Sequence, residues 1–470
     1  MEKKDHFGRN VIELLLLILL GLLWTVEREI PLPGEEKRQK AGQEKGMEEQ
    51  DSALEISVKE EAAEEKEETG IRVVLENEKT GEYYHDRVVL SCSGACLAEG
   101  REAAAGPGET LELTGESPLL EEGVLRLTGE KGEKITVHSL NRDLGNPSYE
   151  GVLEIRKTEE GLLLINEVGL ETYLRYVIPS EMPASYEMEA LKAQAVCART
   201  YACKALEEGR MEKYFADVDD TVSFQVYNNR ESHERTDRAV QETAGKVMTS
   251  GGELITAYFF STSCGHTSTD EVWNGETKET YLKSTYLGEE EKNLETEEAF
   301  SSFIQSEAPS YDQGETWYRW KVEFPFEMLQ ERFWHLEPEG GELCTIRVKE
   351  RGESGVVKQL ELQGTQKSRI LTNEYEIRQW LSPGNLPVER GGRSVSGEMS
   401  ILPSAYFFCE PVEAENGQIR AVQILGGGYG HGVGMSQNGA DQMAQEGKSW
   451  EEILNFFFQN IEITEEEGMK

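Results

Sequence analysis

The sequence predicts an α+β fold: an antiparallel, β-rich body around a long central helix, with an inserted β-rich subdomain and an N-terminal membrane anchor. Three observations predict it. Short runs of Val, Ile and Leu recur between turn residues from about residue 71, as is typical of strands. A stretch of strong helix formers begins near Tyr186. A nearly continuous apolar run occupies Val11 to Val26.

Composition and charge narrow the classes of function. The chain has 470 residues, enough for two or three globular units with cores of their own. Its formal charge of −41 argues against nucleic acid, because no basic stripe is present to displace counterions from phosphates, and it disfavours a polyanionic partner in general. The seven cysteines are an odd number spread over a long chain, so at least one is unpaired and this is not a disulfide scaffold.

The apolar run at 11–26 is broken only by Glu13 and follows three basic residues. It is short for a membrane span of ~30 Å, so a cleaved signal peptide competes with an anchor. Charged residues follow at once, without a small-residue cleavage signature, which favours a retained transmembrane anchor. We expect residues 1–10 in the cytoplasm and the C-terminal body outside the cell membrane. Residues 27–69, rich in Glu, Lys, Gln and Gly, predict a flexible acidic linker.

Residues 70–150 predict a β-rich N-terminal region, with strands at 71–75, 87–90 and 135–140. Cys92 and Cys96 lie in the sequence SCSGAC. A metal knuckle would need two further ligands that the neighbourhood lacks, so a loop or a disulfide is the better interpretation.

The segment 151–285 predicts the first part of a catalytic core. Strands at 151–155 and 162–165 are joined by charged residues ending in Gly161, as in a hairpin. Glu181 follows in the sequence PSEMP, where two prolines predict a stiff, extended corner. We expect a helix from Tyr186, capped by Ser185, to Gly209.

Glu181 has two interpretations. It is either a solvated acid at the positive end of that helix or a general acid. A general acid needs its pKa raised toward ~6, which requires apolar burial. The residues available nearby for that burial are Tyr173, Tyr176, Met182 and Tyr186.

Beyond the helix, residues 217–229 alternate as in a strand. Asp217, Asp219 and Asp220 could bind a cation, but without the glycine and the distal glutamate of a calcium loop they are weak evidence for a site. A hairpin turn at Gly251–Gly252 leads to an apolar strand and then to the polar run 261–267, which is typical of a site rim. The run contains Ser261, Ser263, Cys264 and His266. A thiol nucleophile is disfavoured, because residues two apart on a strand do not bring the base onto the sulfur.

Residues 286–395 predict an insertion subdomain of strands and charged loops with a helix near 373–381, and 396–470 predict the C-terminal part of the core. The glycine-rich sequence GGGYGHGVGMSQNGA begins at Gly426 and lacks P-loop or dinucleotide spacing. So many glycines indicate a close backbone approach, either to a ligand or in a tight turn against the core. We expect the side chains exposed beside it to be His431, Ser436 and Gln437.

Three ordered motifs carry a family resemblance: IPSEMP with EALKAQAVCARTYA, STSCGHTSTDEVW with YLKS at 281–284, and GYGHGVGMSQNGA with a terminal SWEEILNFFFQNIEI. Together they resemble the family of stage II sporulation protein D, the SpoIID/LytB domain family, which includes amidase-enhancer proteins. The matching positions span about 150–285 and 420–463.

The resemblance implies a membrane-tethered lytic transglycosylase of endospore formers, which cuts peptide-stripped glycan strands of peptidoglycan during engulfment in a groove on the central helix. It places the catalytic acid at Glu181 and active-site residues at Arg199, Tyr281 and Lys283. We expect Tyr281 and Lys283 on one face of a strand, in contact with substrate. Arg199 lies ~20 Å along the helix from Glu181, so it binds distal glycan or holds structure.

Some members of that family bind zinc in the segment matching 212–224. The corresponding positions here include Val218, Ser223 and Phe224, so we expect no metal and no cofactor. The implied partners are the glycan strands, the membrane, the sporulation amidase-endopeptidase (protein P) and the membrane protein M of the engulfment complex, with the body on the mother-cell side of the intermembrane space. A non-catalytic wall-binding protein that enhances or positions an amidase is the alternative function.

Overall fold

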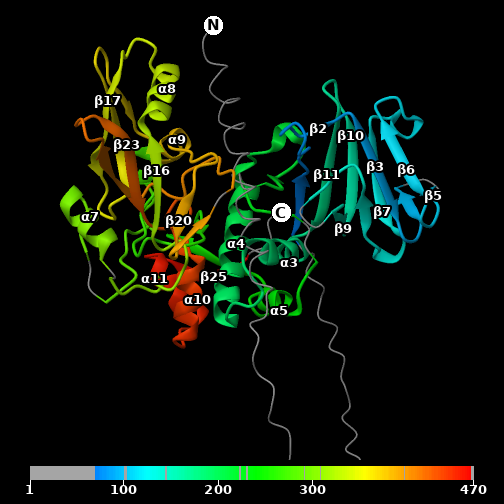
Figure 1. The fold of residues 1–470 in the computed structure, drawn as a ribbon. Helices are drawn as coiled ribbons and strands as arrows, with labels where there is room; N and C mark the ends of the chain where they lie inside the picture. The colour runs from blue at the N-terminus through cyan, green and yellow to red at the C-terminus, as the bar shows by residue number, and fades with distance from the viewer. Residues whose placement is uncertain are drawn as a thin grey trace, which may run out of the picture.

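The computed structural model describes residues 69–466 apart from 100–102, 143–144, 222–223, 229–230, 290–291, 307 and 396. The expected cytoplasmic segment and anchor, and all but the end of the linker, lie outside the described residues. None of the helices within the described part combines the length and the apolar composition required to cross a bilayer. The described chain is a mixed α+β fold with several β-sheets, as predicted (Figure 1).

The helices are concentrated in the middle and at the C-terminal end of the described chain (Figure 1). They are α3 (Leu170–Glu181), α4 (Met188–Glu208), α5 (Glu234–Glu242), α6 (Glu271–Asn274), α7 (Glu297–Gln305), α8 (Phe326–Leu336), α9 (Glu374–Trp380), α10 (Gln437–Gln445) and α11 (Trp450–Phe457), with 3-10 turns at Pro118–Leu120, Glu130–Gly132 and Glu212–Tyr214.

Two sheets form the N-terminal region, at the right of Figure 1. The strands are β1 (Gly70–Val74), β2 (Tyr84–His85), β3 (Arg87–Cys92), β4 (Cys96–Ala98), β5 (Ala103–Ala105), β6 (Thr110–Thr114), β7 (Val124–Gly129), β8 (Ile135–Val137), β9 (Ser148–Tyr149), β10 (Val152–Lys157), β11 (Leu162–Gly169) and β12 (Val218–Asp219). One sheet has the order β12-β1-β11-β10-β7-β4-β5, with β2 also paired to β11, and the other β6-β3-β8-β9. The predicted hairpin is present as the antiparallel pair β10 and β11.

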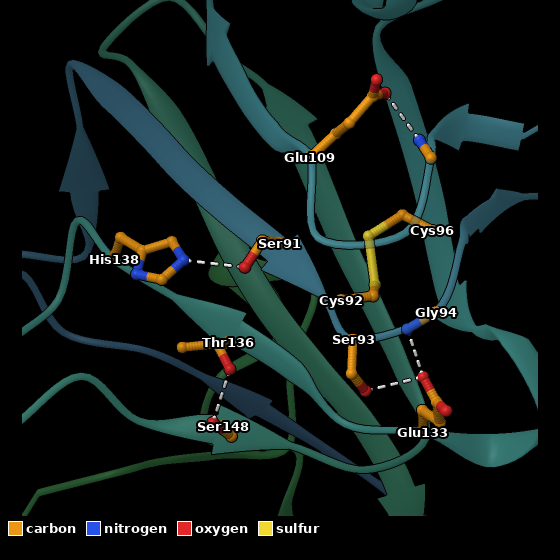
Figure 2. The surroundings of a disulfide bond; sticks show 11 residues. Ser91, Cys92, Ser93, Gly94, Cys96, Glu109, Glu133, Thr136, His138 and Ser148 are labelled. Atoms are coloured by element: carbon orange, nitrogen blue, oxygen red, sulfur yellow. Dashed lines mark hydrogen bonds between the residues drawn. A yellow bond between two sulfur atoms is a disulfide. The ribbon is translucent and has the colours of Figure 1, made fainter.

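A disulfide joins Cys92, the last residue of β3, to Cys96, the first residue of β4 (Figure 2). It therefore links the two sheets of the N-terminal region. The turn between the cysteines is held by the Glu133 carboxylate, which accepts hydrogen bonds from the Ser93 hydroxyl at 2.7 Å and from the Gly94 N–H. Of the two interpretations of SCSGAC, the structure has the disulfide.

The predicted central helix is α4, which packs against α3, α5, α10 and α11. Its alanines are small enough to let these neighbours approach closely, and they are buried. It ends at Gly209 in the left-handed conformation, as predicted. The predicted start is wrong: the N-cap is Glu187, and Ser185 is exposed in a turn closed by the Tyr186 N–H on the Pro183 carbonyl.

Small sheets attach the C-terminal end of the chain to this helical layer. β13 (Lys246–Ser250) forms the predicted hairpin with β14 (Glu253–Leu254) and also pairs with β25 (Glu462–Glu465). β15 (Phe259–Phe260) pairs in parallel with β24 (Met435–Ser436), which immediately precedes α10. Isolated bridges pair Thr262 with Tyr429 and Ser268 with Val433, so the polar run after β15 and the glycine-rich segment before β24 lie side by side.

The strands at the left of Figure 1 enclose a second hydrophobic core, which includes Phe324, Leu360 and Ile424. Its sheets have the orders β21-β20-β16-β23-β22 and β17-β18-β19. The strands are β16 (Trp320–Pro325), β17 (Leu343–Arg351), β18 (Val357–Gly364), β19 (Arg369–Leu371), β20 (Val388–Arg390), β21 (Arg393–Val395), β22 (Phe407–Glu413) and β23 (Ile419–Gly426). One sheet thus combines strands from both sides of residue 396, where we predict the end of the insertion.

Candidate active site

Glu181 is the last residue of α3, and Pro179 lies inside that helix. The predicted extended corner is therefore wrong up to Met182, where the backbone does become extended. Pro179 cannot donate the helical hydrogen bond of its position, and the buried face formed by Tyr173 and Val177 keeps the helix in place despite this loss. The carboxyl group consequently lies at the negative end of a helix dipole, not at the positive end.

The Glu181 side chain is half-buried and accepts one hydrogen bond, from the backbone N–H of Val226 to Oε1 at 2.8 Å. Burial raises the pKa of Glu181 to about 7, and the Val226 N–H opposes this rise because it favours the charged form. No charged side chain among the described residues contributes to the shift. Glu181 is thus an isolated carboxyl group that exchanges its proton near neutral pH.

The four residues proposed for apolar burial are themselves buried. Tyr173 donates from its hydroxyl to Gln225 Oε1 at 3.3 Å, and Gln225 precedes the residue that binds Glu181. The Gln225 amide donates in turn to the Ala198 carbonyl on α4 at 3.2 Å. The loop that holds the Glu181 carboxylate is therefore fixed to both α3 and α4.

The C-terminal motif meets this segment directly. The Gln437 amide nitrogen donates to the Glu181 carbonyl at 3.2 Å, and the Tyr186 hydroxyl donates to Asn438 Oδ1. The Glu187 N–H donates to the Asp441 carboxylate at 2.6 Å. Three hydrogen bonds thus hold the first half of α10 against the segment that contains Glu181.

The glycine-rich segment packs against protein and not around an open site. A Cβ on Gly428, whose φ is +88°, would lie 2.9 Å from the Cys264 nitrogen, and one on Gly434 would lie 2.1 Å from the Tyr258 carbonyl oxygen. The close approach that the sequence indicates is therefore the tight turn against the core. The expected exposure of Ser436 and Gln437 is wrong: their exposed fractions are 0% and 8%.

His431 is half-buried. Its Nε2 lies 3.0 Å from the Phe259 carbonyl oxygen, and its Nδ1 accepts from the Val433 N–H at 3.1 Å. This pattern places the proton on Nε2. Burial lowers the pKa of His431 to about 3, so the ring is neutral.

The serines of the two polar motifs converge on Asp312, a residue that no motif in the sequence marks. Asp312 Oδ2 accepts from the Ser263 N–H at 3.1 Å and from the Ser263 hydroxyl, and both carboxylate oxygens lie 3.0 Å from Ser436 Oγ. All three side chains are buried, and burial raises the Asp312 pKa to about 7. Ser261 is half-buried, with its hydroxyl 3.2 Å from that of Thr262.

Tyr281 and Lys283 do not lie on a strand, in contrast to the prediction. The Tyr281 hydroxyl accepts from the Thr256 N–H at 3.0 Å, and the Lys283 ammonium lies 5.5 Å from the centre of the Phe456 ring. Tyr281 lines a cleft of about 400 Å³. The rest of its lining is Lys204, Glu208, Ser250, Glu253, Leu254, Ile255, Thr256, Glu279 and Thr280.

Arg199 has no exposed surface, and its guanidinium pairs with both oxygens of Glu171 at 2.6 and 2.7 Å. It also donates to the carbonyls of Val240 and Lys246. Arg199 therefore joins α3, α5 and β13 in the core. Of its two interpretations, binding of distal glycan and holding structure, the contacts agree with the second. Contact with a glycan would require this core to open.

The thiol interpretation finds no support in the geometry. Cys264 is fully buried, and burial raises its pKa to about 12, so a thiolate is scarce at neutral pH. Both ring nitrogens of His266 lie beside carbonyl oxygens, of Thr267 at 2.9 Å and Lys292 at 3.2 Å. The ring is thus not positioned as a base for the sulfur.

No group of three or more His, Cys, Asp or Glu within the described ranges is arranged to hold a metal ion. The three aspartates after α4 serve the protein itself. Asp217 accepts from the Arg72 N–H, Asp219 from Thr221 and Tyr83, and Asp220 from the Glu76 N–H and Arg142. The strand predicted over 217–229 is limited to β12.

Comparisons with known proteins agree with the motif pattern. Residues 158–250 match the SpoIID family, described as Stage II sporulation protein, and residues 267–434 match a domain of unknown function (DUF8618). The chain is 30% identical over 318 residues to Stage II sporulation protein D of Bacillus subtilis (strain 168), covering 64% of this chain and 76% of that protein.

Two further similarities cover different shares of the relatives. The chain is 28% identical over 298 residues to the amidase enhancer of Bacillus subtilis (strain 168), covering 62% of this chain but only 40% of that protein. It is 28% identical over 323 residues to an uncharacterized protein of Brachyspira hyodysenteriae (strain ATCC 49526 / WA1), covering 68% of this chain and 74% of that protein.

Proposed function

Because the chain belongs to the family of Stage II sporulation protein D, we propose that it is a peptidoglycan lytic transglycosylase. It cleaves the bond from N-acetylmuramic acid to N-acetylglucosamine in peptide-stripped glycan strands and leaves 1,6-anhydromuramic ends. In a sporulating bacterium this activity would serve engulfment. Glu181 is the acid and then the base of the reaction.

The chemistry needs only one carboxyl group. Ordinary glycosidases use two, one to protonate the leaving oxygen and one to form or activate the nucleophile. Here the 6-hydroxyl of the muramic acid attacks its own anomeric carbon, and intramolecular attack supplies an effective concentration on the order of 10⁵ M. The Glu181 proton passes to the glycosidic oxygen as that bond breaks, and the carboxylate then takes the proton of the 6-hydroxyl as the new C–O bond forms.

The observation that carries the proposal is the isolated, half-buried Glu181 carboxyl, whose pKa is raised to about 7. At this value both the protonated and the charged form are populated at neutral pH, as a group that alternates between acid and base requires. Val226 occupies Oε1, and the second oxygen is then available to the substrate. The contact of Gln437 with the Glu181 carbonyl fixes the backbone behind the carboxyl.

The proposal assigns substrate contacts to the half-buried residues of the predicted set, which are Ser261, Lys283 and His431, and to Tyr281 in its cleft. Ser263, Ser436, Gln437 and Arg199 hold the surrounding backbone. We also propose a membrane anchor, an extracytoplasmic body and contact with the amidase-endopeptidase and the membrane protein of the engulfment complex. The disulfide between Cys92 and Cys96 supports an oxidising compartment outside the cytoplasm.

The test is cleavage of peptide-stripped glycan by the purified full chain, with the products identified by mass spectrometry. We expect anhydromuramic ends that disappear in Glu181→Gln. Glu187→Gln is the matched control, because Glu187 is an exposed carboxylate on the same stretch. Reducing ends would instead indicate hydrolysis, and persistence of the anhydro product in Glu181→Gln would refute the assigned role.

A second candidate is a non-catalytic wall-binding protein that enhances an amidase. The similarity to a protein named amidase enhancer favours it. It predicts that the chain releases no fragment from glycan alone but raises the rate of an added amidase, and that Glu181→Gln retains this effect.

A further inference from the structure

Five aromatic rings form a continuous row that begins on the loop whose Val226 N–H binds Glu181. Phe224 and Tyr201 lie 4.9 Å apart between ring centres, Tyr201 and Tyr258 5.9 Å, Tyr258 and Trp273 5.0 Å, and Trp273 and His431 5.3 Å. We call these five side chains the aromatic row. They come from the loop after β12, from α4, from the segment before β15, from α6 and from the glycine-rich segment.

The row lies at the margin of the main hydrophobic core, against which Phe224, Tyr258 and Trp273 pack. Each of its five side chains is only partly buried. Neighbouring rings are tilted by 48–59°, an ordinary packing geometry for aromatic side chains. Each ring therefore keeps some surface in contact with solvent, and aromatic surface that is shared by five separate segments is available to a ligand.

One end of the row is fixed to the candidate acid. Phe224 lies two residues before Val226, whose N–H binds the Glu181 carboxylate. Tyr201 lies three residues after Ala198, whose carbonyl anchors the same loop through Gln225. From that end the row continues from Tyr201 through Tyr258 to Trp273 and His431.

Polar groups border the row, as a carbohydrate requires. The guanidinium of Arg210 pairs with Glu208 and interacts with Tyr201 and Tyr258. Glu208 also lines the cleft that contains Lys204 and Tyr281. A row of apolar faces bordered by a few hydrogen-bonding groups matches a pyranose, which has an apolar C–H face and a hydroxylated edge.

We propose that the aromatic row is the floor of a glycan-binding groove, on which successive sugar rings of one strand stack on the way to Glu181. This inference rests on the proposed function for the identity of the strand, but it concerns binding and not chemistry. A nucleic acid could also stack on such rings, but the formal charge of −41 repels it. The occupant is therefore a glycan oligosaccharide.

The test measures the affinity of the full chain for peptide-stripped glycan oligosaccharides of increasing length, by calorimetry. All variants carry Glu181→Gln, so that no ligand is cleaved. We expect affinity to rise with length and Trp273→Ala to weaken the longer ligands by about tenfold, the size of effect an aromatic contact supplies. In Trp273→Ala, the shortest ligand that still binds at Glu181 should keep its affinity. In Trp273→Phe, the longer ligands should regain most of the lost affinity.

Trp334→Ala is the matched control, because Trp334 is an exposed tryptophan on α8, outside the row. It should leave the dependence on length unchanged. An equal loss for all lengths in Trp273→Ala, or no loss, would overturn the proposal, as would a proline-rich peptide that binds in place of the glycan. The unmodified chain could cleave no glycan while Trp273→Ala still weakens the affinity for long oligosaccharides. In that case the proposed function fails and the groove stands.

Discussion

Glu181 and Asp312 have the same raised pKa in very different surroundings. Burial raises the pKa of both Glu181 and Asp312 to about 7. Asp312 has no exposed surface, and both of its oxygens contact serine hydroxyls from the two polar motifs. Glu181 is half-buried and has a single backbone donor on one oxygen. A raised pKa alone thus does not identify a catalytic acid; access and an oxygen left for substrate do.

The difference between the two carboxyls also indicates a structural role for the two polar motifs around Asp312. Ser263 and Ser436 are among the residues that the sequence suggests for substrate binding, yet their hydroxyls face the same buried carboxylate. The buried cluster of Asp312, Ser263 and Ser436, which we call the closed region, therefore holds β15 against β24. Helix α10 follows β24 and contacts the Glu181 carbonyl. The closed region therefore supports the surroundings of Glu181, which we call the open region.

The largest effect should separate the two carboxyls by function. Glu181→Gln should lower the rate of glycan cleavage by about 10²–10⁴-fold, the usual contribution of a general acid. Its melting temperature should not fall, because the amide keeps the shape of the side chain and removes a carboxyl that is costly to charge when buried. Cleavage assays and thermal unfolding of the same preparation measure the rate and the melting temperature. A drop in melting temperature that accounts for the lost rate would erase the distinction.

Asp312→Asn should show the opposite behaviour. The amide replaces an oxygen that accepts hydrogen bonds with an N–H donor facing Ser436 or Ser263, so we expect a loss of about 2–3 kcal/mol in the free energy of unfolding. Urea denaturation measures the loss, with the exposed Asp86→Asn as the control. Cleavage per folded molecule should stay close to that of the unmodified chain. A large fall in that quantity without a loss of stability would place Asp312 in the chemistry.

The dependence on pH sharpens the comparison further. The folded-state pKa of each group lies above its ordinary value, 4.5 for Glu181 and 3.8 for Asp312. Their contribution to stability is therefore fully present below the ordinary value and is lost as pH rises through about 7. Each amide variant should flatten that decline of stability. Only Glu181 should also govern activity, so cleavage should fall above pH ~7 in the unmodified chain and in Asp312→Asn alike. An activity profile that shifts in Asp312→Asn would contradict this assignment.

Local rules predicted much of the framework but not the environment of either carboxyl. Helix α4, the hairpin of β10 and β11, and the end of α4 at Gly209 follow from composition and turn residues within a few positions. The cluster at Asp312 joins residues 49 and 124 positions away, and no local pattern marks such a contact. Pro179 also misled the prediction of a corner, because burial of the Tyr173 face outweighs the local preference of a proline near a helix end.

The smallest effect tests whether the closed region contains chemistry of its own. Cys264 follows Ser263, is fully buried, and its carbonyl accepts from Arg319 at 2.8 Å. Cys264→Ala should cost about 1 kcal/mol of stability through lost packing. It should leave the cleavage rate and the titration of Glu181 unchanged, because no hydrogen bond of the Cys264 side chain reaches the open region in the described part of the chain. Parallel unfolding and cleavage assays decide the point: if Cys264→Ala abolished cleavage while Glu181→Gln preserved it, the nucleophile would be the thiol and the roles of the two regions would be reversed.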